Sequence, residues 1–192
     1  IFEYNDDIVI LDMGLQFPEE DMPGIDYIIP DIRYLEGKEK NIRGVILSHG
    51  HLDHIGAVPH ILPKLGWPPV YASRLTLFLL RKRLEESNLA QYLVAHEINS
   101  ADEQFTLGDY FKVNLFEVTH SIMDALGVIL QTPAGNIIHP GDWRYDLSPV
   151  NGKPTDFSHL ARWNTKEKPS VLMMESLGST KEGSQLSESE VY

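Results

Sequence analysis

Three histidines and one aspartate lie within six consecutive residues, directly after a short apolar segment. The apolar residues 45–47 indicate a buried strand, and residues 48–54 then read Ser-His-Gly-His-Leu-Asp-His. The glycine lets the backbone turn tightly. Imidazole and carboxylate groups are ligands for zinc and related divalent ions. Without a metal ion, several titratable side chains would lie close together in a small volume with no stabilising interaction in return. The cluster therefore predicts a metal site at the end of a strand.

Composition restricts the kind of protein that can carry this cluster. The chain has 192 residues, 42% hydrophobic and 23% charged, as in one soluble globular domain. It has no cysteine, which excludes disulfides and thiolate ligands. The net charge of −12 disfavours electrostatically driven nucleic-acid binding and suits a small-molecule enzyme or a protein that binds metal cations. No apolar run reaches the roughly 18 residues of a membrane-spanning helix, so no membrane partner is expected.

The hydrophobic pattern predicts strands with interspersed helices. Apolar runs bounded by turn residues indicate strands at 8–12, 45–47, 70–72, 111–115, 127–131 and 136–139. Helices are expected over 55–65 and after Ser73, and a long loop with one short helix is expected over 15–44. The apolar positions of the second helix are Leu75, Leu79, Leu80 and Leu84. This order predicts an α/β fold (α+β in some schemes) built in layers.

Ligand-type residues follow three of these strands. His49 and His51 are two residues apart and can bind one ion, whereas Asp53 and His54 lie beyond the turn and can serve a second. His120 follows the strand at 111–115, and Asp142 follows the strand at 136–139. Strand ends that meet at one sheet edge build sites, so His120 and Asp142 are candidates for the missing ligands.

The motif His49-x-His51-x-Asp53-His54 resembles the HxHxDH signature of the metallo-β-lactamase superfamily. Segments 17–31, 119–125 and 139–146 narrow the resemblance to the ribonuclease J family of β-CASP nucleases. They read FPEEDMPGIDYIIPD, THSIMDA and HPGDWRYD. The resemblance runs from about residue 2 to about residue 177, which is most of the chain.

The resemblance implies an αββα sandwich, here incomplete, with two zinc ions that manganese can replace. It implies that the first ion is bound by His49, His51 and His120, and the second by Asp53 and His54, with Asp142 bridging both. Asp53, His54 and Asp142 are the implied catalytic residues. The family's last second-site histidine has no counterpart in this chain, because His159 does not match its motif.

The resemblance also predicts the domain organisation. Residues 1–177 are expected to form a metallo-β-lactamase domain without its opening strands and C-terminal part. The family inserts a β-CASP domain after a segment like Glu175-Ser176, so residues 178–192 are expected to be a linker or the start of that insertion. We therefore expect the chain to be a piece of a longer protein.

The implied function is zinc-dependent hydrolysis of RNA phosphodiester bonds, in endonucleolytic and 5′-exonucleolytic modes, during RNA processing and decay. RNA would be the partner, the cytoplasm the location, and the full-length protein is compatible with a homo-oligomer. One alternative is a hydrolase of small substrates such as a lactam, thioester or lactone. Another is a non-catalytic scaffold, which would have lost ligands, whereas every visible ligand position here is filled.

Several other polar residues have open or structural interpretations. His60, His96 and His159 are expected to be structural or surface groups. His139 is a candidate for orienting a ligand, while Asp12 and Asp124 either hold a ligating imidazole or cap a turn. The basic run 81–83 is interpreted as a solvated helix face, with a phosphate-facing patch as the alternative.

Overall fold

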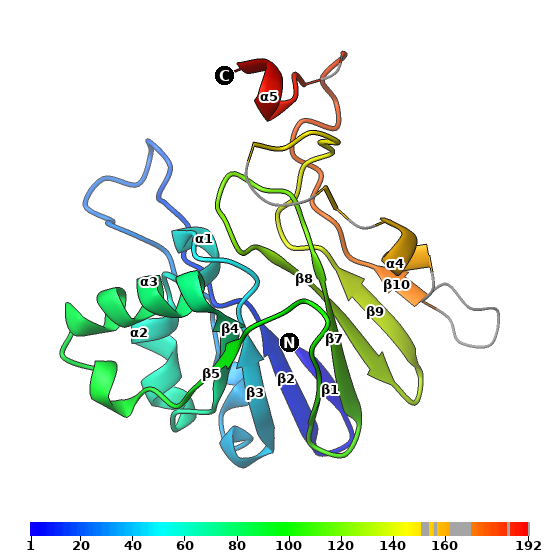
Figure 1. The fold of residues 1–192 in the computed structure, drawn as a ribbon. Coiled ribbons are helices and arrows are strands. Elements are labelled where there is room, and N and C mark those ends of the chain that lie inside the picture. Colours follow the sequence, from blue (N-terminus) through cyan, green and yellow to red (C-terminus); the bar gives the residue numbers. More distant parts are fainter. Residues whose placement is uncertain (151–153, 156, 162–169, 184, 192) are drawn as a thin grey trace. The chain divides into compact units, whose positions relative to one another are not determined.

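The computed structural model describes residues 1–150, 154–155, 157–161, 170–183 and 185–191. The chain divides into two compact units. The N-terminal unit comprises Ile1–Asn99 and Leu107–Asp109, and the C-terminal unit comprises Ser100–Thr106 and Tyr110–Tyr192. Each unit holds most of one five-stranded sheet (Figure 1). The mixed α/β class is confirmed, and the boundary between residues 177 and 178 stays a prediction.

The sheet of the N-terminal unit is mostly parallel. Its strands, in spatial order, are β1 (Phe2–Tyr4), β2 (Asp7–Leu11), β3 (Ile42–Ile46), β4 (Val70–Ser73) and β5 (Ala95–Ile98). β1 and β2 are antiparallel, and the other neighbours are parallel. Parallel pairing places the carboxyl ends of β2 and β3 at the same edge, so the residues after these two strands lie side by side.

Short helices cover this sheet. They are η1 (Arg33–Leu35), η2 (Glu39–Asn41), α1 (Leu52–Ile55), α2 (Val58–Ile61), η3 (Leu62–Leu65), α3 (Arg74–Glu85) and η4 (Ala90–Tyr92). Strand residues such as Ile10 and Val45 form one buried core with Ile61, Leu80 and Leu84 of the helices. Figure 1 shows α2 and α3 gathered on one side of the strands. Burial against these helices accounts for Ile8, Ile10 and Val45. Val9 and Ile46 lie outside this cluster but are buried as well, so the apolar residues of β2 and of the end of β3 do not alternate with polar ones.

The sheet of the C-terminal unit is mainly antiparallel. Its strands, in spatial order, are β10 (Ser170–Leu172), β9 (Gly135–His139), β8 (Leu126–Thr132), β7 (Phe111–Glu117) and β6 (Gln104–Leu107). The strands predicted at 127–131 and 136–139 are confirmed and form a hairpin, because β8 and β9 pair antiparallel from Val128↔His139 to Thr132↔Gly135. Two short helices, α4 (Phe157–Ala161) and α5 (Glu188–Val191), complete the described part of this unit.

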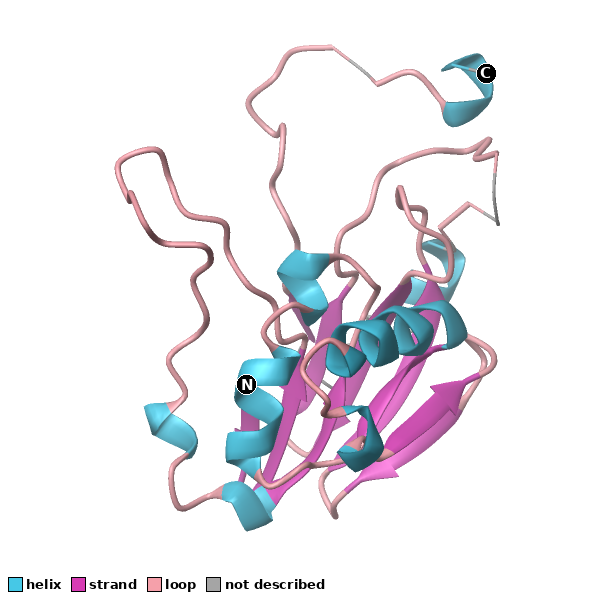
Figure 2. Ribbon diagram, turned by 90° about the vertical axis from the view of Figure 1, so that its left-hand side faces the viewer, coloured by secondary structure: helices cyan, strands magenta, loops and turns pink. Residues whose placement is uncertain are grey.

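The predicted long loop is confirmed, with two single-turn helices instead of one. The backbone of Gln16 and Ile28 pairs in an isolated antiparallel bridge that closes the base of the segment between them. This segment is the blue loop at the upper left of Figure 1, and Figure 2 shows it as an extended arm. No helix in the described residues is long and apolar enough to cross a membrane.

One helix prediction needs correction. The single helix expected over 55–65 is instead α2 followed by the 3₁₀ turn η3, with α1 ending before it at Ile55. Pro63 has no N–H to donate to the turn before it, so an α-helix cannot run through this position unperturbed. The helix expected after Ser73 is confirmed as α3, in which Leu80 and Leu84 are buried together with Leu77, while Leu75 and Leu79 are half-buried.

Gly127 in β8 provides a test of how the second sheet packs. It pairs with Phe116, and a Cβ at position 127 would lie 2.1 Å from the Phe116 ring. Gly127→Ala should therefore lower the free energy of unfolding by about 1–3 kcal/mol through overpacking, measured by urea denaturation. The loss should shrink in a Phe116→Leu background, where the ring is gone. Equal losses in both backgrounds would contradict this packing.

Candidate metal centre

The histidine-rich turn begins where β3 ends. Leu47 donates its N–H to the carbonyl of Tyr71 in β4 at 2.9 Å, which continues the sheet by one residue. His49 is fully buried, and His51 is extended, with φ −72° and ψ 153°, so it forms the N-terminal boundary of α1. Asp53 and His54 lie within α1. The turn thus carries four predicted ligands on a few residues anchored to the sheet at one end and to a helix at the other.

Asp12, the residue after β2, connects this turn to the neighbouring strand. Its carboxylate accepts hydrogen bonds from the Ser48 N–H at 2.7 Å and from the Ser48 Oγ–H at 2.8 Å. Its Oδ2 also lies 2.8 Å from Nδ1 of His54. A carboxylate only accepts, so Nδ1 of His54 carries the proton and Nε2 presents a lone pair suited to a metal. Asp12 thus contacts an imidazole, as one of its two interpretations requires, and that this imidazole binds a metal stays a prediction; its own backbone is left-handed, with φ +58°.

His49 and His51 form a pair with the spacing of two ligands on one ion. Nε2 of His49 lies 3.1 Å from Nδ1 of His51. A zinc–nitrogen distance of about 2.0–2.1 Å puts two imidazole nitrogens about 3.3–3.4 Å apart in a tetrahedral site. The other ring nitrogen of His49 contacts Ser48 Oγ at 3.0 Å, which fixes the orientation of the ring. The donor set and its spacing therefore fit a zinc-type ion.

Asp53 and His54 form a second pair. Oδ2 of Asp53 lies 3.7 Å from Nε2 of His54, within the roughly 4 Å that two ligands of one ion can span. The Asp53 side chain is 59% exposed, whereas that of His54 is 13% exposed. Asp53 is thus accessible to a substrate or water molecule, while the His54 ring is oriented by the contact of its Nδ1 with Asp12.

A close backbone approach at Gly14 sets the position of α1. The segment after β2 bonds directly to the helix: Met13 donates its N–H to the His54 carbonyl at 2.7 Å, and Ala57 donates to the Met13 carbonyl at 3.0 Å. A Cβ at Gly14 would lie 1.5 Å from the carbonyl oxygen of Asp53. Only glycine allows this contact, so Gly14 helps to set the position of Asp53 and His54.

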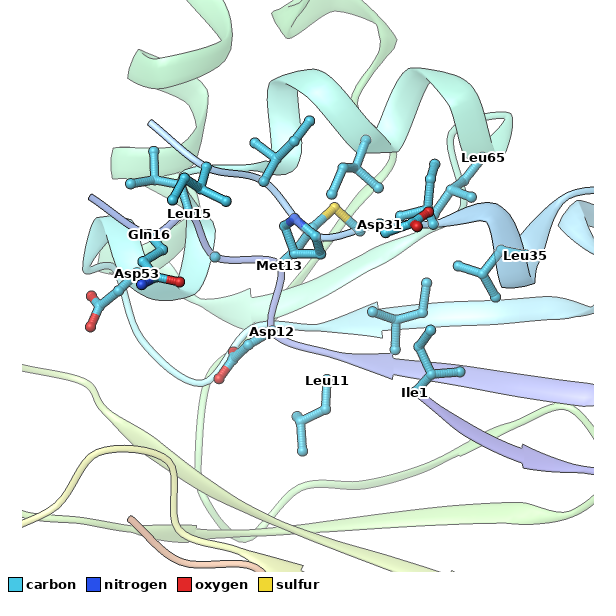
Figure 3. Close-up of a pocket in the computed structure, with 17 residues that line it drawn as sticks. Ile1, Leu11, Asp12, Met13, Leu15, Gln16, Asp31, Leu35, Asp53 and Leu65 are labelled. Carbon is cyan, nitrogen blue, oxygen red and sulfur yellow. The ribbon is translucent and has the colours of Figure 1, made fainter. Parts of the chain in front are cut away.

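A largely apolar cavity of about 500 Å³ adjoins Asp12 and Asp53. Figure 3 shows Asp12 and Asp53 on one side of it and Leu35 and Leu65 on the other. Asp31 also borders the cavity, but its carboxylate accepts hydrogen bonds from Arg33, which lower the pKa of Asp31 to about 2. Asp31 therefore pairs with an arginine, whereas Asp12 contacts the candidate ligand His54.

The remaining two predicted ligands lie together in the C-terminal unit. His120 follows β7, and Asp142 follows β9 after Gly141, whose φ of +67° turns the chain. Nε2 of His120 lies 3.9 Å from Oδ2 of Asp142, again within reach of one shared ion. The Thr119 N–H donates to Oγ1 of Thr155 at 3.0 Å, which ties the loop beside His120 to a distant segment.

Glu175 is a supporting residue that the sequence analysis did not identify as such. Its Oε1 accepts the N–H of Trp143 at 3.0 Å, and Arg144 donates its N–H to the Thr119 carbonyl at 2.8 Å. These two backbone contacts hold the residues directly after Asp142. The sequence feature that could have indicated this role is the polar pair Glu175-Ser176, which ends the apolar run at 171–174.

The residues interpreted as structural have ordinary contacts. The His96 ring stacks on Tyr71, its partner in the β4–β5 pair, with centroids 4.6 Å apart, and the His60 ring lies 4.8 Å from that of Tyr27. His139 contacts the Met173 carbonyl through Nδ1 at 3.0 Å, so an orienting role toward a ligand stays a prediction. Asp124 adopts φ +61° in the turn between β7 and β8. The His159 side chain lies outside the described residues.

The basic run on α3 behaves as a solvated helix face. Lys82 pairs with Glu85 at 2.8 Å, and Arg83 pairs with Glu86 at 2.7 Å. Exposed pairs of this kind contribute little to stability, about 0.3–0.5 kcal/mol each. Two of the three cations of this run are thus paired with acidic neighbours on the same helix, as the solvated-face interpretation predicts.

Comparison with known proteins places the chain in a family. The sequence model of the metallo-beta-lactamase superfamily matches residues 1–168. Ribonuclease J of Thermus thermophilus is 43% identical over 178 residues, covering 91% of this chain and 30% of that protein. Ribonuclease J 1 of Streptococcus pyogenes is 41% identical over 159 residues, covering 83% and 28%. These identities confirm the resemblance to ribonuclease J, and the chain spans less than a third of the length of these relatives.

Solved structures agree on the fold. A protein of unknown function from Enterococcus faecalis superposes with a TM-score of 0.56 at 20% identity, covering 96% of this chain and 48% of that one. The metallo-beta-lactamase fold protein YhfI of Bacillus subtilis gives a TM-score of 0.50 at 15% identity, covering 71% and 51%. Together with the match over residues 1–168, this establishes that the chain belongs to the metallo-β-lactamase superfamily.

Proposed function

We propose that this chain carries the metal centre of a zinc-dependent ribonuclease that hydrolyses RNA phosphodiester bonds. The observation that carries the proposal is the filled set of six ligand positions in a chain 43% identical to a ribonuclease J. Endonucleolytic and 5′-exonucleolytic modes are part of the proposal. RNA is the proposed partner and the cytoplasm the proposed location, while a homo-oligomer of the full-length protein stays a prediction.

The six ligands are proposed to act as two sets. His120 would join His49 and His51 on the first ion, and Asp142 would bridge to the second ion beside Asp53 and His54. Pair spacings of 3.1, 3.7 and 3.9 Å support this assignment, because each fits two ligands on one ion. Imidazole and carboxylate donors without thiolate favour zinc and accept manganese as a substitute.

Two divalent ions in such a site lower the pKa of a water molecule and offset negative charge on phosphoryl oxygens. The protein's own part is orientation and proton transfer. Asp53 is exposed enough to accept the proton of an attacking water at its carboxylate. Asp12 keeps Nε2 of His54 available as a ligand, and the Trp143 and Arg144 amides keep the loop of Asp142 in place.

Asp12→Asn tests the orienting contact. Asparagine tolerates the left-handed backbone of position 12, but its amide N–H group would face Nδ1 of His54 and move the ring proton to Nε2. The zinc affinity of the site that includes His54 should fall about 10- to 100-fold, measured by competition with a chromogenic chelator. Asp31→Asn is the matched control and should leave zinc affinity unchanged. Unchanged affinity in Asp12→Asn would show that the carboxylate does not orient a ligand.

Asp53→Ala tests the proposed function. Removal of a ligand and proton acceptor should lower the turnover of 5′-monophosphorylated single-stranded RNA by about 10²–10⁴-fold in the full-length protein, with the fold intact by circular dichroism. His60→Ala, one helix further along, should cleave RNA like the wild type. Equal losses at both positions would refute the assigned site. Hydrolysis of a chromogenic lactam in place of RNA would refute the proposed substrate.

A further inference from the structure

Three aromatic rings follow the candidate ligand Asp142 and form a connected row. Trp143 packs against the core of the C-terminal unit, which fixes the inner end. Its ring meets that of Phe157 edge to face, with centroids 5.6 Å apart, and the Phe157 ring contacts Tyr145 at 5.7 Å. The outer rings are open: Phe157 is 39% exposed and Tyr145 is 65% exposed. The row therefore runs from a buried anchor to a solvent-accessible tyrosine.

The main chain around this row is held by several hydrogen bonds. Asp146 is buried, and its carboxylate accepts the Ser187 hydroxyl at 2.6 Å and the Glu188 N–H at 2.9 Å. These hydrogen bonds lower the pKa of Asp146, so it stays ionised at neutral pH. Tyr145 lies one residue before this anchored carboxylate, so its main chain is held in place while its ring stays exposed to solvent.

The charges around the row indicate which kind of contact it can make. Among the described residues, the arginine next to the row is Arg144, which donates to the Leu186 carbonyl at 2.8 Å and lies 3.5 Å from Glu188. Asp146 and Glu175 add further negative charge nearby. The described part of this surface therefore offers little positive charge to a phosphate group. A nucleobase is uncharged and has an aromatic face, so it can stack on tyrosine despite the acidic surroundings.

We propose that Tyr145, backed by Phe157, is a stacking platform for a nucleobase of a single-stranded RNA next to the scissile phosphate. This inference rests on the proposed function and deepens it, because it assigns part of the RNA binding to contacts with bases rather than with phosphates. Tyr145 lies three residues after Asp142, so the stacked base belongs to a nucleotide that flanks the bond to be cut. Binding through uncharged bases suits a chain whose net charge is −12, because it does not require positive charge on the protein.

The test combines a protein change with an RNA change in the full-length protein. Tyr145→Ala should raise KM for a 5′-monophosphorylated single-stranded RNA about 5- to 100-fold, with kcat nearly unchanged, and Tyr145→Phe should restore it. Removing the base beside the cleaved bond should weaken binding to the wild type but not weaken it further in Tyr145→Ala. Because phosphates are not involved, the dependence of binding on salt should be the same in both proteins.

Tyr92→Ala is the matched control. Tyr92 is 54% exposed and contacts the Trp67 ring at 5.4 Å, but it lies in η4 of the N-terminal unit, and its loss should leave KM unchanged. If the wild type cleaves RNA and the losses from Tyr145→Ala and from base removal simply add, the stacking proposal is wrong while the function stands. If the wild type does not cleave RNA, both proposals are overturned.

Discussion

The Asp12 carboxylate is the interaction on which the N-terminal half of the candidate metal centre depends. It follows one buried strand and bonds to both the backbone and the hydroxyl of Ser48, which follows the neighbouring strand. The same carboxylate contacts His54, which is in α1. One side chain therefore fixes the separation of two strand ends and the orientation of the ring of His54, a candidate ligand. The close approach at Gly14 adds the second constraint, because it sets how near α1 lies to the strand end.

Much of the site could be predicted because its chemistry is local in sequence. His49, His51, Asp53 and His54 lie within one turn, so residue type and spacing identify them without a fold. His120 and Asp142 could be predicted as partners because each follows an apolar strand, and the structure places this pair within 3.9 Å. The six predicted strands were found for the same reason, since apolar runs bounded by turn residues depend little on distant contacts, whereas β1 and β5 lack such runs and were not predicted.

The sequence left the partners of the supporting residues open. Asp12 was a candidate to hold an imidazole, but its partner His54 lies 42 positions away, and Glu175, which was not a candidate, meets Trp143 across 32 positions. No local pattern specifies which carboxylate will face which histidine or amide. The helix over 55–65 was wrong for a different reason, because the signal of Pro63 was present but was outweighed by the apolar pattern.

The proposed RNA substrate is negatively charged and the chain is acidic, so the proposed function requires positive charge, which two bound ions would supply. The basic run on α3 is largely paired with glutamates, so it does not supply that charge. Among the described residues, the metal site and the proposed contacts to bases are the two means of RNA binding that we infer. If the proposed function holds, the ligand set would serve both to activate water and to attract the substrate.

The proposed first metal site takes His49 and His51 from one unit and His120 from the other. Anomalous diffraction at the zinc absorption edge, from crystals of the zinc-loaded full-length protein, would locate the ion. We expect a strong peak about 2.0–2.1 Å from nitrogen atoms of all three histidines. A strong peak bound by His49 and His51 without His120, or by none of the three, would refute the proposed first site.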